Sequence, residues 1–292
     1  MLNITPVTNH REREKGVIIY PVYSRRSEGL SIGINLFTDK KSCAFDCPYC
    51  EVFPFSGGAE FSLEQMEDDL RAAAADAHKQ NIPIKDFCFS GNGEPTLSPV
   101  FGGALKLAEN IRLELSPSSQ LVIITNGTGL SQPRVFSLLK EAAQNPAVDI
   151  WLKVDAGTAD WYQKMNRPGG NLRFTDSAAI RALSFDKHIE KIKEFTSCSI
   201  VTIQTMLCAI NEEPPPQKEA LSWENFVLEL AANAADNKAG GIRKIQIYGK
   251  ARAAPEDPLA SVLPDEYLEK RAGSLRNVFT QNGLSIPVEI YF

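Results

Sequence analysis

The sequence lacks the features of a membrane or secreted protein. Its 292 residues contain no apolar run of about eighteen residues, so no transmembrane helix is predicted. Residues 1–15 contain no apolar stretch of signal-peptide length. We therefore expect a cytoplasmic protein with no membrane partner, in a compartment where thiols stay reduced.

The sequence also lacks a basic run. The formal net charge is −5, and the only basic clusters are small, such as Arg25-Arg26, Lys40-Lys41 and Lys250 with Arg252. This charge argues weakly against a nucleic-acid binder that relies on its own basic surface, although a local patch is compatible with it.

Histidine is scarce, and cysteine is concentrated in one place. The three histidines show no ligand spacing, whereas three of the six cysteines form Cys43-Ala-Phe-Asp-Cys47-Pro-Tyr-Cys50. Three close thiolates with no obvious fourth suit a four-iron cluster in which one iron stays open for a ligand. A disulfide would leave one thiol over and is unexpected in a reducing compartment. A structural zinc, which needs a fourth ligand, and a coincidence of spacing remain alternatives.

The other three cysteines occur singly in apolar runs. Cys88, Cys198 and Cys208 are predicted to lie inside strands, not in loops. A free cysteine in such a setting usually packs as a small hydrophobic residue.

Strand-like runs alternate with helical periods along the chain. Strands are predicted at 31–36, 85–90, 120–125, 149–155, 199–206 and 243–248. Helices are predicted at 62–79, 133–143, 185–195 and 222–237, with Ser62 and Gln65 as a capping box for the first and Ser222 as the cap of the last. This order predicts βαβ units and a parallel sheet. We expect a single domain over 1–292, with a core at about 30–250 and an extension at 251–292 that contains a helix (265–280) and a strand (286–291).

Several predicted strands have one apolar and one polar face. Lys153 and Asp155 share a face with Trp151, and Gln246 and Tyr248 share a face on another strand. Strands buried on both faces would be apolar throughout. The pattern therefore favours a barrel-like sheet around a ligand cavity over a doubly wound sheet.

The unusual segments directly follow predicted strands. They are the cysteine loop, Ser90-Gly91-Asn92-Gly93-Glu94-Pro95, Thr125-Asn126-Gly127, Asp155-Ala156-Gly157 and Tyr248-Gly249. Ligands of parallel α/β folds bind outside the carboxyl ends of the strands, so these segments predict one site. Glycines allow close approach of the backbone to a ligand, and Glu94 would present a carboxylate suited to an ammonium group.

At these motifs the chain resembles a radical S-adenosylmethionine (SAM) enzyme. The cysteine loop matches the C-x3-C-x2-C pattern of that superfamily, including the aromatic Tyr49, and Ser90–Pro95 matches its Gly-Gly-Glu region. Over roughly residues 30–256, the chain further resembles a bacterial and archaeal branch related to the wybutosine-forming enzymes that modify tRNA. The segments that carry this second resemblance are 90–97, 125–128, 153–157, 166–168 and 251–256.

The resemblance implies a fold and a reaction. The fold would be α/β, a partial (β/α)6 TIM-like barrel with a C-terminal helix-strand extension. The cofactors would be a 4Fe–4S cluster and SAM. One electron from an external flavodoxin- or ferredoxin-like donor would split the sulfonium C–S bond, and a 5′-deoxyadenosyl radical would take a hydrogen atom from the substrate.

The resemblance also implies residue roles. Cys43, Cys47 and Cys50 would hold three irons of the cluster. The remaining residues would contact SAM: Ser90, Gly91, Gly93 and Glu94 at the methionine ammonium group, Tyr49 and Tyr248 at the adenine, and Asp155 with Asn126 or Gln204 at the ribose hydroxyls.

The chain departs from the wybutosine-forming enzymes in one respect. Those enzymes carry extra N-terminal cysteines for a second cluster, whereas residues 1–42 contain none. They also use a lysine with a carbonyl co-substrate. Lys153 is the candidate for that catalytic role, although an ion pair with Asp155 or a contact with SAM is the favoured interpretation. Arg167 is a second catalytic candidate at the mouth of the site, with a solvated loop arginine as the alternative.

Three functions follow from these observations. The first is a radical SAM enzyme whose substrate is unidentified, with a tRNA base as the leading candidate. The second is a radical SAM activase or maturase that acts on a protein or small molecule. The third is a non-catalytic protein with a structural zinc or iron–sulfur site, which the Gly93-Glu94 loop and the polar strand faces disfavour.

Overall fold

The chain forms two compact units. The computed structural model describes residues 16–52, 55–169, 183–235, 240–252, 254 and 257–292. One unit comprises Met1–Cys43, Val52–Thr125 and Asn145–Asp149, and the other comprises Ala44–Glu51, Asn126–Gln144 and Ile150–Phe292. The cysteine loop is thus divided between the two units, because Cys43 belongs to the first unit and Cys47 and Cys50 belong to the second. Within the described ranges, no helix has the length and apolar character needed to cross a membrane.

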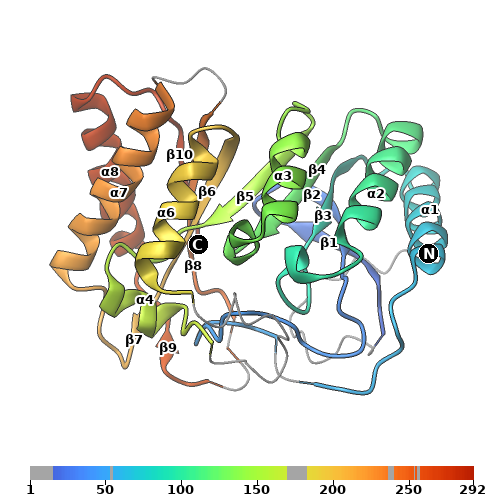
Figure 1. Cartoon of the computed structure of the whole chain (residues 1–292), viewed down its shortest axis with the longest axis horizontal. Helices are drawn as coiled ribbons and strands as arrows, with labels where there is room; N and C mark the ends of the chain where they lie inside the picture. Colours follow the sequence, from blue (N-terminus) through green and yellow to red (C-terminus); the bar gives the residue numbers. More distant parts are fainter. Residues whose placement is uncertain (1–15, 53–54, 170–182, 236–239, 253, 255–256) are drawn as a thin grey trace. The chain divides into compact units, whose positions relative to one another are not determined.

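The first unit is a sheet covered by two helices. Its strands are β1 (Ile19–Ser24), β2 (Gly29–Ile34), β3 (Ile84–Phe89) and β4 (Gln120–Thr125). β2, β3 and β4 are parallel neighbours in that order, and β1 adds to β2 in antiparallel fashion. Helices α1 (Leu63–Lys79) and α2 (Phe101–Leu115) pack against one another (Figure 1).

The second unit contains four parallel strands in the order β5, β6, β8 and β10. They span Val148–Lys153, Ile200–Leu207, Gly241–Gly249 and Val288–Tyr291, and β5 begins with two residues of the first unit. The helices are α3 (Pro133–Ala142), α4 (Ala159–Met165), α6 (Phe185–Thr196), α7 (Gln217–Ala235) and α8 (Asp265–Gln281). A separate antiparallel pair is formed by β7 (Ala209–Ile210) and β9 (Ala260–Ser261). α7 and α8 pack side by side, and both also contact β8 (Figure 1).

The predicted elements are present, and the sequence interpretation missed several others. All six predicted strands occur within about two residues of their expected bounds, and so do the final helix and strand. Strand β1 and helices α2 and α4 were not predicted. Helix α2 begins at Phe101, and the Gly102-Gly103 pair in its first turn masks its start, although Phe101, Ala104, Ala108 and Ile111 do follow a helical period.

Two of the predicted caps need correction. The helix expected at 222–237 begins at Gln217, directly after the Pro214–Pro216 run, so Ser222 lies inside α7 and does not cap it. Residues 236 and 237 of that prediction lie outside the described residues, as do 253, 255 and 256 of the 251–256 segment. Ser62 does cap α1 by accepting a hydrogen bond from Gln65 N at 3.3 Å. The Gln65 side chain instead donates to Asp69 Oδ1 at 2.8 Å, so no capping box is completed.

The expected alternation of polar and apolar faces is confirmed on β6 and β8. Ile203, Ile245 and Ile247 are fully buried on the apolar face, and α7 packs against β8. On the other face, Gln204 and Gln246 are opposite one another and also fully buried. Gln204 Nε2 donates to Gln246 Oε1 at 2.7 Å, which offsets much of the cost of burying these amides.

Candidate active site

The glycine-rich loop after β3 pairs with the backbone that leads into the cysteine motif. Ser42 N donates to Asn92 O at 3.1 Å, and Glu94 N donates to Ser42 O at 2.8 Å. A Cβ atom on Gly93 would lie 1.8 Å from Ser42 O. Gly93 is therefore required for the close approach of two segments of the protein, in addition to any approach to a ligand.

Glu94 is fixed by the hydroxyl groups of Thr96, in a short 3-10 helix, and Thr125, at the end of β4. Its carboxyl Oε1 accepts from Thr96 Oγ1 at 2.5 Å and from Thr125 Oγ1 at 2.7 Å. The side chain is buried, and it also caps the short 3-10 helix η2 (Pro95–Leu97). The carboxylate is therefore held in one orientation at the carboxyl ends of β3 and β4.

The other predicted residues of this loop are also anchored. Gly91 has a φ of 120°, and a Cβ atom there would meet Asn35 Oδ1 at 2.8 Å. The Ser90 hydroxyl lies within hydrogen-bonding distance of the Tyr20 hydroxyl on β1. The structure thus brings Ser90, Gly91, Gly93 and Glu94 together with the residue that precedes Cys43.

Replacing Gly93 by alanine is expected to destabilise the protein by about 2–3 kcal/mol, because the methyl group would push two backbone segments apart. Gly273 provides the matched control. It lies in α8, and a Cβ atom there would meet no atom within 4 Å, so Gly273→Ala is expected to stabilise the protein by about 0.5–1 kcal/mol. Urea unfolding monitored by circular dichroism measures both changes. An unaltered midpoint for Gly93→Ala would contradict the close approach to Ser42.

The part of the cysteine loop in the second unit is paired with the segment after α4. Asp46 N donates to Asn166 O at 3.0 Å, and Gly169 N donates to Ala44 O at 2.9 Å. Within the loop, Cys50 N donates to Cys47 O at 2.9 Å, so a tight turn joins these two cysteines. At the end of the loop, Glu51 Oε2 forms an ion pair with Arg252 Nε at 2.7 Å.

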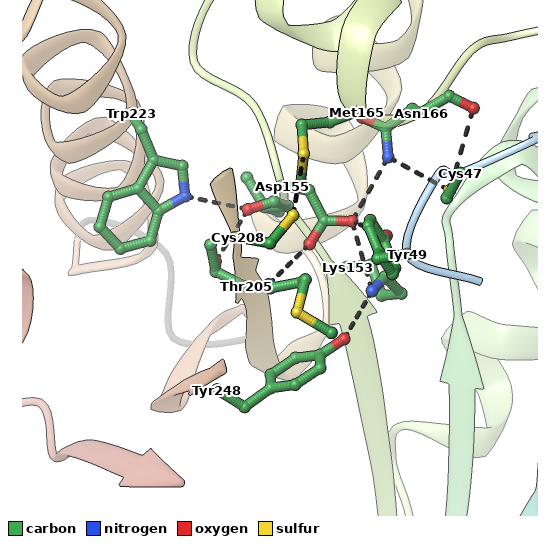
Figure 2. Close-up of polar contacts among 12 residues, drawn as sticks. Cys47, Tyr49, Lys153, Asp155, Met165, Asn166, Thr205, Cys208, Trp223 and Tyr248 are labelled. Atoms are coloured by element: carbon green, nitrogen blue, oxygen red, sulfur yellow. Dashed lines mark hydrogen bonds and ion pairs between the residues drawn. The ribbon is translucent and has the colours of Figure 1, made fainter. Parts of the chain in front are cut away.

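Asp155 is the centre of the polar network in the second unit (Figure 2). Its Oδ1 accepts from Met206 N at 2.9 Å, and its Oδ2 accepts from the Tyr49 hydroxyl and from Asn166 Nδ2 at 3.3 Å. The network joins the cysteine loop to the carboxyl ends of β5 and β6. Burial, followed by the charge of Asp155, raises the pKa of Tyr49, so the phenol stays protonated and donates to Asp155.

Lys153 belongs to the same network. Its Nζ lies 3.3 Å from Asp155 Oδ2, donates to the Tyr248 hydroxyl at 2.6 Å and lies 4.7 Å from the centre of the Tyr49 ring. Burial alone would lower the pKa of Lys153, but Asp155 and Tyr248 outweigh that effect and raise it. The favoured ion pair with Asp155 is present. A nucleophilic role with a carbonyl compound would require loss of the proton that this pairing stabilises.

The remaining predicted site residues of the second unit have other partners. Gln204 pairs with Gln246, as described above. Asn126 Oδ1 accepts from Thr128 N at 3.0 Å and from Thr128 Oγ1 at 2.7 Å, so it orders the turn into η3 (Thr128–Ser131). Arg167 has a φ of 45° and forms an ion pair with Asp257. These contacts support structural roles for Asn126 and Arg167, whose proposed roles in binding or catalysis stay predictions.

The sequence interpretation gave no role to several residues that shape this network. Asn166 was noted only as part of a motif, yet it contacts both Asp155 and Cys47. Trp223 Nε1 and Thr205 Oγ1 both donate to Val154 O, at 2.9 and 2.8 Å, and so hold the strand end next to Asp155.

The prediction that Cys88, Cys198 and Cys208 lie inside strands is correct only for Cys88. Cys198 lies in the turn after α6, and Cys208 directly follows β6, because both strand-like apolar runs extend beyond the hydrogen-bonded strand. Burial raises the pKa of Cys208 to about 12, and its thiol contacts Met165 Sδ at 3.6 Å. Cys88 and Cys208 are buried, neutral thiols, as expected for packing residues.

His188 lies against the cysteine loop in an apolar setting. Its ring stacks on Tyr162 at 5.5 Å and meets the edge of Phe45 at 5.6 Å. Among the described residues, its Nδ1 has no hydrogen-bond partner. Burial lowers the pKa of His188 to about 4, an effect that Asp155 partly opposes.

The lowered pKa of His188 predicts a loss of stability in acid. Below about pH 6.5 the unfolded chain binds a proton that the folded protein takes up only near pH 4, so the free energy of unfolding should fall by about 2 kcal/mol between pH 6.5 and 5. His188→Phe should remove this component, whereas His78→Gln, at an exposed position, should leave it. Urea titrations at several pH values measure how steeply the free energy of unfolding falls as the pH is lowered. Equal slopes for His188→Phe and the wild type would contradict the buried neutral imidazole.

Comparison with known proteins settles the family. A sequence model of the radical SAM superfamily matches residues 40–195, which is more than half of the chain and includes Cys43, Cys47 and Cys50. The chain belongs to the radical SAM superfamily. It is therefore a member of a superfamily of enzymes that is characterised by SAM and a 4Fe–4S cluster.

The curated relatives of this radical SAM chain are described only as UPF0026 proteins. One, from Helicobacter pylori strain J99, is 34% identical over 131 residues, which cover 43% of this chain and 39% of the relative. Another, from Synechocystis sp. strain PCC 6803, is 30% identical over 151 residues, or 51% of each chain. The chain thus matches about half, or less, of the length of these relatives.

Solved radical SAM structures share the fold. A radical SAM methyltransferase from Sphaerobacter thermophilus is 14% identical and has a TM-score of 0.58, with 93% of this chain and 68% of the other covered. Streptococcus suis SuiB bound to SAM is 14% identical and has a TM-score of 0.59, with 86% and 48% covered. The predicted fold class, an α/β partial TIM-like barrel, is confirmed by this likeness.

The cysteine loop carries thiol groups, the donor type that iron–sulfur clusters require. Among the described residues, no three His, Cys, Asp or Glu side chains are gathered closely enough to hold a metal ion. The three thiols nevertheless lie on one loop, and all three are partly exposed. Burial raises the pKa of Cys47 to about 12, although Lys153 partly opposes this effect, so metal binding would have to displace the thiol proton.

Proposed function

We propose that this chain is a radical SAM enzyme that holds a 4Fe–4S cluster on Cys43, Cys47 and Cys50. With SAM bound, such a cluster supplies one-electron reductive cleavage of the sulfonium, which starts radical chemistry on a substrate. An external flavodoxin- or ferredoxin-like protein would donate the electron. The observation that carries the proposal is the connection of the cysteine loop, through Tyr49 and Asn166, to Asp155 beside the end of β5.

The chain's own residues have defined tasks in this proposal. Ser90, Gly91, Gly93 and Glu94 would bind the methionine ammonium group, and the buried orientation of Glu94 supports a fixed carboxylate for that purpose. Tyr49 and Tyr248 would border the adenine. Asp155 already accepts hydrogen bonds from three donors and pairs with Lys153. A ribose hydroxyl would therefore have to replace one of these contacts or bind beside them.

Two classes of substrate are compatible with the proposed function. A tRNA base is the leading candidate because the motifs at 90–97, 125–128 and 153–157 resemble those of the branch related to wybutosine-forming enzymes; the comparisons with known proteins support the superfamily and not this branch. The net charge of −5 leaves little basic surface for tRNA. A peptide or protein is the second candidate, because the structurally similar SuiB has been crystallised with its precursor peptide SuiA. A non-catalytic structural metal site is disfavoured by membership of an enzyme superfamily.

Anaerobic reconstitution with iron, sulfide, a reductant and SAM tests the proposal. We expect a brown protein that releases 5′-deoxyadenosine and methionine. A colourless protein that retains one zinc ion and never cleaves SAM would refute it. Binding of bulk tRNA at moderate salt separates the substrate classes, since such binding weakens steeply as salt rises.

A further inference from the structure

Asn166 lies between the cysteine loop and the Asp155 network. It ends helix α4 and is buried, with 4% of its surface exposed. Its Nδ2 lies 3.3 Å from Asp155 Oδ2 and 3.9 Å from Cys47 Sγ (Figure 2). A primary amide has two N–H groups, so its two donors match these two acceptors. The reverse orientation would place Oδ1 against the Asp155 carboxylate, which would repel it.

The backbone carbonyl group of Asn166 also contacts the cysteine loop. Asn166 O accepts from Asp46 N at 3.0 Å and from the Cys47 thiol at 3.9 Å. The backbone contact with Asp46 does not depend on the protonation of Cys47, so it keeps the loop beside Asn166. The thiol proton is lost when a metal binds. Sγ can then only accept, and the side-chain amide of Asn166 is a donor that lies next to it, together with the Tyr49 hydroxyl.

We propose that Asn166 is a positioning residue for the cluster, whose amide donates one hydrogen bond to the Cys47 thiolate and another to Asp155. This inference rests on the proposed function, since it requires a cluster on Cys47. Hydrogen bonds to ligand sulfurs are among the factors that set the potential of iron–sulfur clusters. The positive end of an N–H dipole favours the more negative, reduced state, so Asn166 raises the reduction potential.

The test compares three variants in the absence of SAM. Asn166→Leu keeps the branched shape of the side chain but removes both donors, and Asn166→Gln keeps the amide on a longer side chain. Lys164→Ala is the control, because this exposed residue lies on the same helix and its Nζ lies over the Trp161 ring. Reduction is followed by electron paramagnetic resonance during a potentiometric titration of the reconstituted proteins. We expect reduction of the leucine variant to be about tenfold less favourable, a fall of about 59 mV. The glutamine variant should lie between it and the wild type, and Lys164→Ala should not differ from the wild type.

A second readout keeps the proposal falsifiable if the leucine variant assembles no cluster. Exchange of the wild type into D2O should shift its Fe–S(Cys) stretching bands in the resonance Raman spectrum, because a donor to sulfur exchanges its hydrogen. The absence of any shift would overturn the proposal. An unchanged potential in a fully loaded Asn166→Leu protein would overturn it as well. If either result accompanies release of 5′-deoxyadenosine by the wild type, the proposed function stands and only the role of Asn166 fails. A wild type that holds no cluster would overturn both.

Discussion

Cys47→Ala is expected to lower the release of 5′-deoxyadenosine by more than about 100-fold, since loss of even an outer-shell partner of a metal can reach that size. Cys47 is the middle cysteine of the motif and is joined to Cys50 by a tight turn. Two thiolates cannot replace three, so the iron and sulfide content after reconstitution should fall in parallel. Metal analysis and chromatography of the SAM cleavage products measure the two effects.

Cys198→Ala is the matched control for this prediction. Cys198 lies in the turn after α6, and its thiol contacts only the Glu194 and Phe195 carbonyl groups and Ser199 among the described residues. The Cys198→Ala variant should retain the iron content of the wild type and release as much 5′-deoxyadenosine. Wild-type cleavage of SAM by Cys47→Ala would show that the cysteine motif does not hold the catalytic cluster.

Asp155→Asn is expected to lower the free energy of unfolding by about 3–5 kcal/mol, because it removes one partner of a buried ion pair. The Asp155 carboxylate has no exposed surface and compensates the charge of Lys153, whose side chain is only 15% exposed. The new amide would offer a donor where Asn166 Nδ2 and the Tyr49 hydroxyl also donate. Urea unfolding at pH 7 measures the loss, and SAM binding should weaken in the same variant.

Asp257→Asn gives the comparison for an ion pair that is more exposed than Lys153–Asp155. Asp257 pairs with Arg167, and the two side chains are 20% and 27% exposed, so loss of this charge should cost less than about 1 kcal/mol. Equal destabilisation by Asp155→Asn and Asp257→Asn would contradict the central position of Asp155. A stable Asp155→Asn protein that no longer binds SAM would instead support a direct contact of Asp155 with the ligand.

The local patterns of the chain were sufficient to locate most elements. Alternation on β6 and β8 is visible in the sequence because the strand period separates Ile245 and Ile247 from Gln246. The start of α7 was misplaced because Ser222 offered a capping signal within a helix that the preceding prolines already define. Strand β1 was missed because an antiparallel edge strand has no place in the βαβ pattern that guided the interpretation.

The sequence by itself determined the superfamily and the position of the motifs. Thiol spacing and glycine-rich turns are local properties, and strand periodicity places them at the carboxyl ends of strands. The tertiary structure decided which residues contact one another in the site. Met206 and Tyr49 reach Asp155 from segments 51 and 106 residues away along the chain, and Asn166 reaches it from the end of α4. Ser42 contacts Gly93, which belongs to the loop after β3. Such contacts depend on how strands pair and helices pack, and no local pattern encodes them.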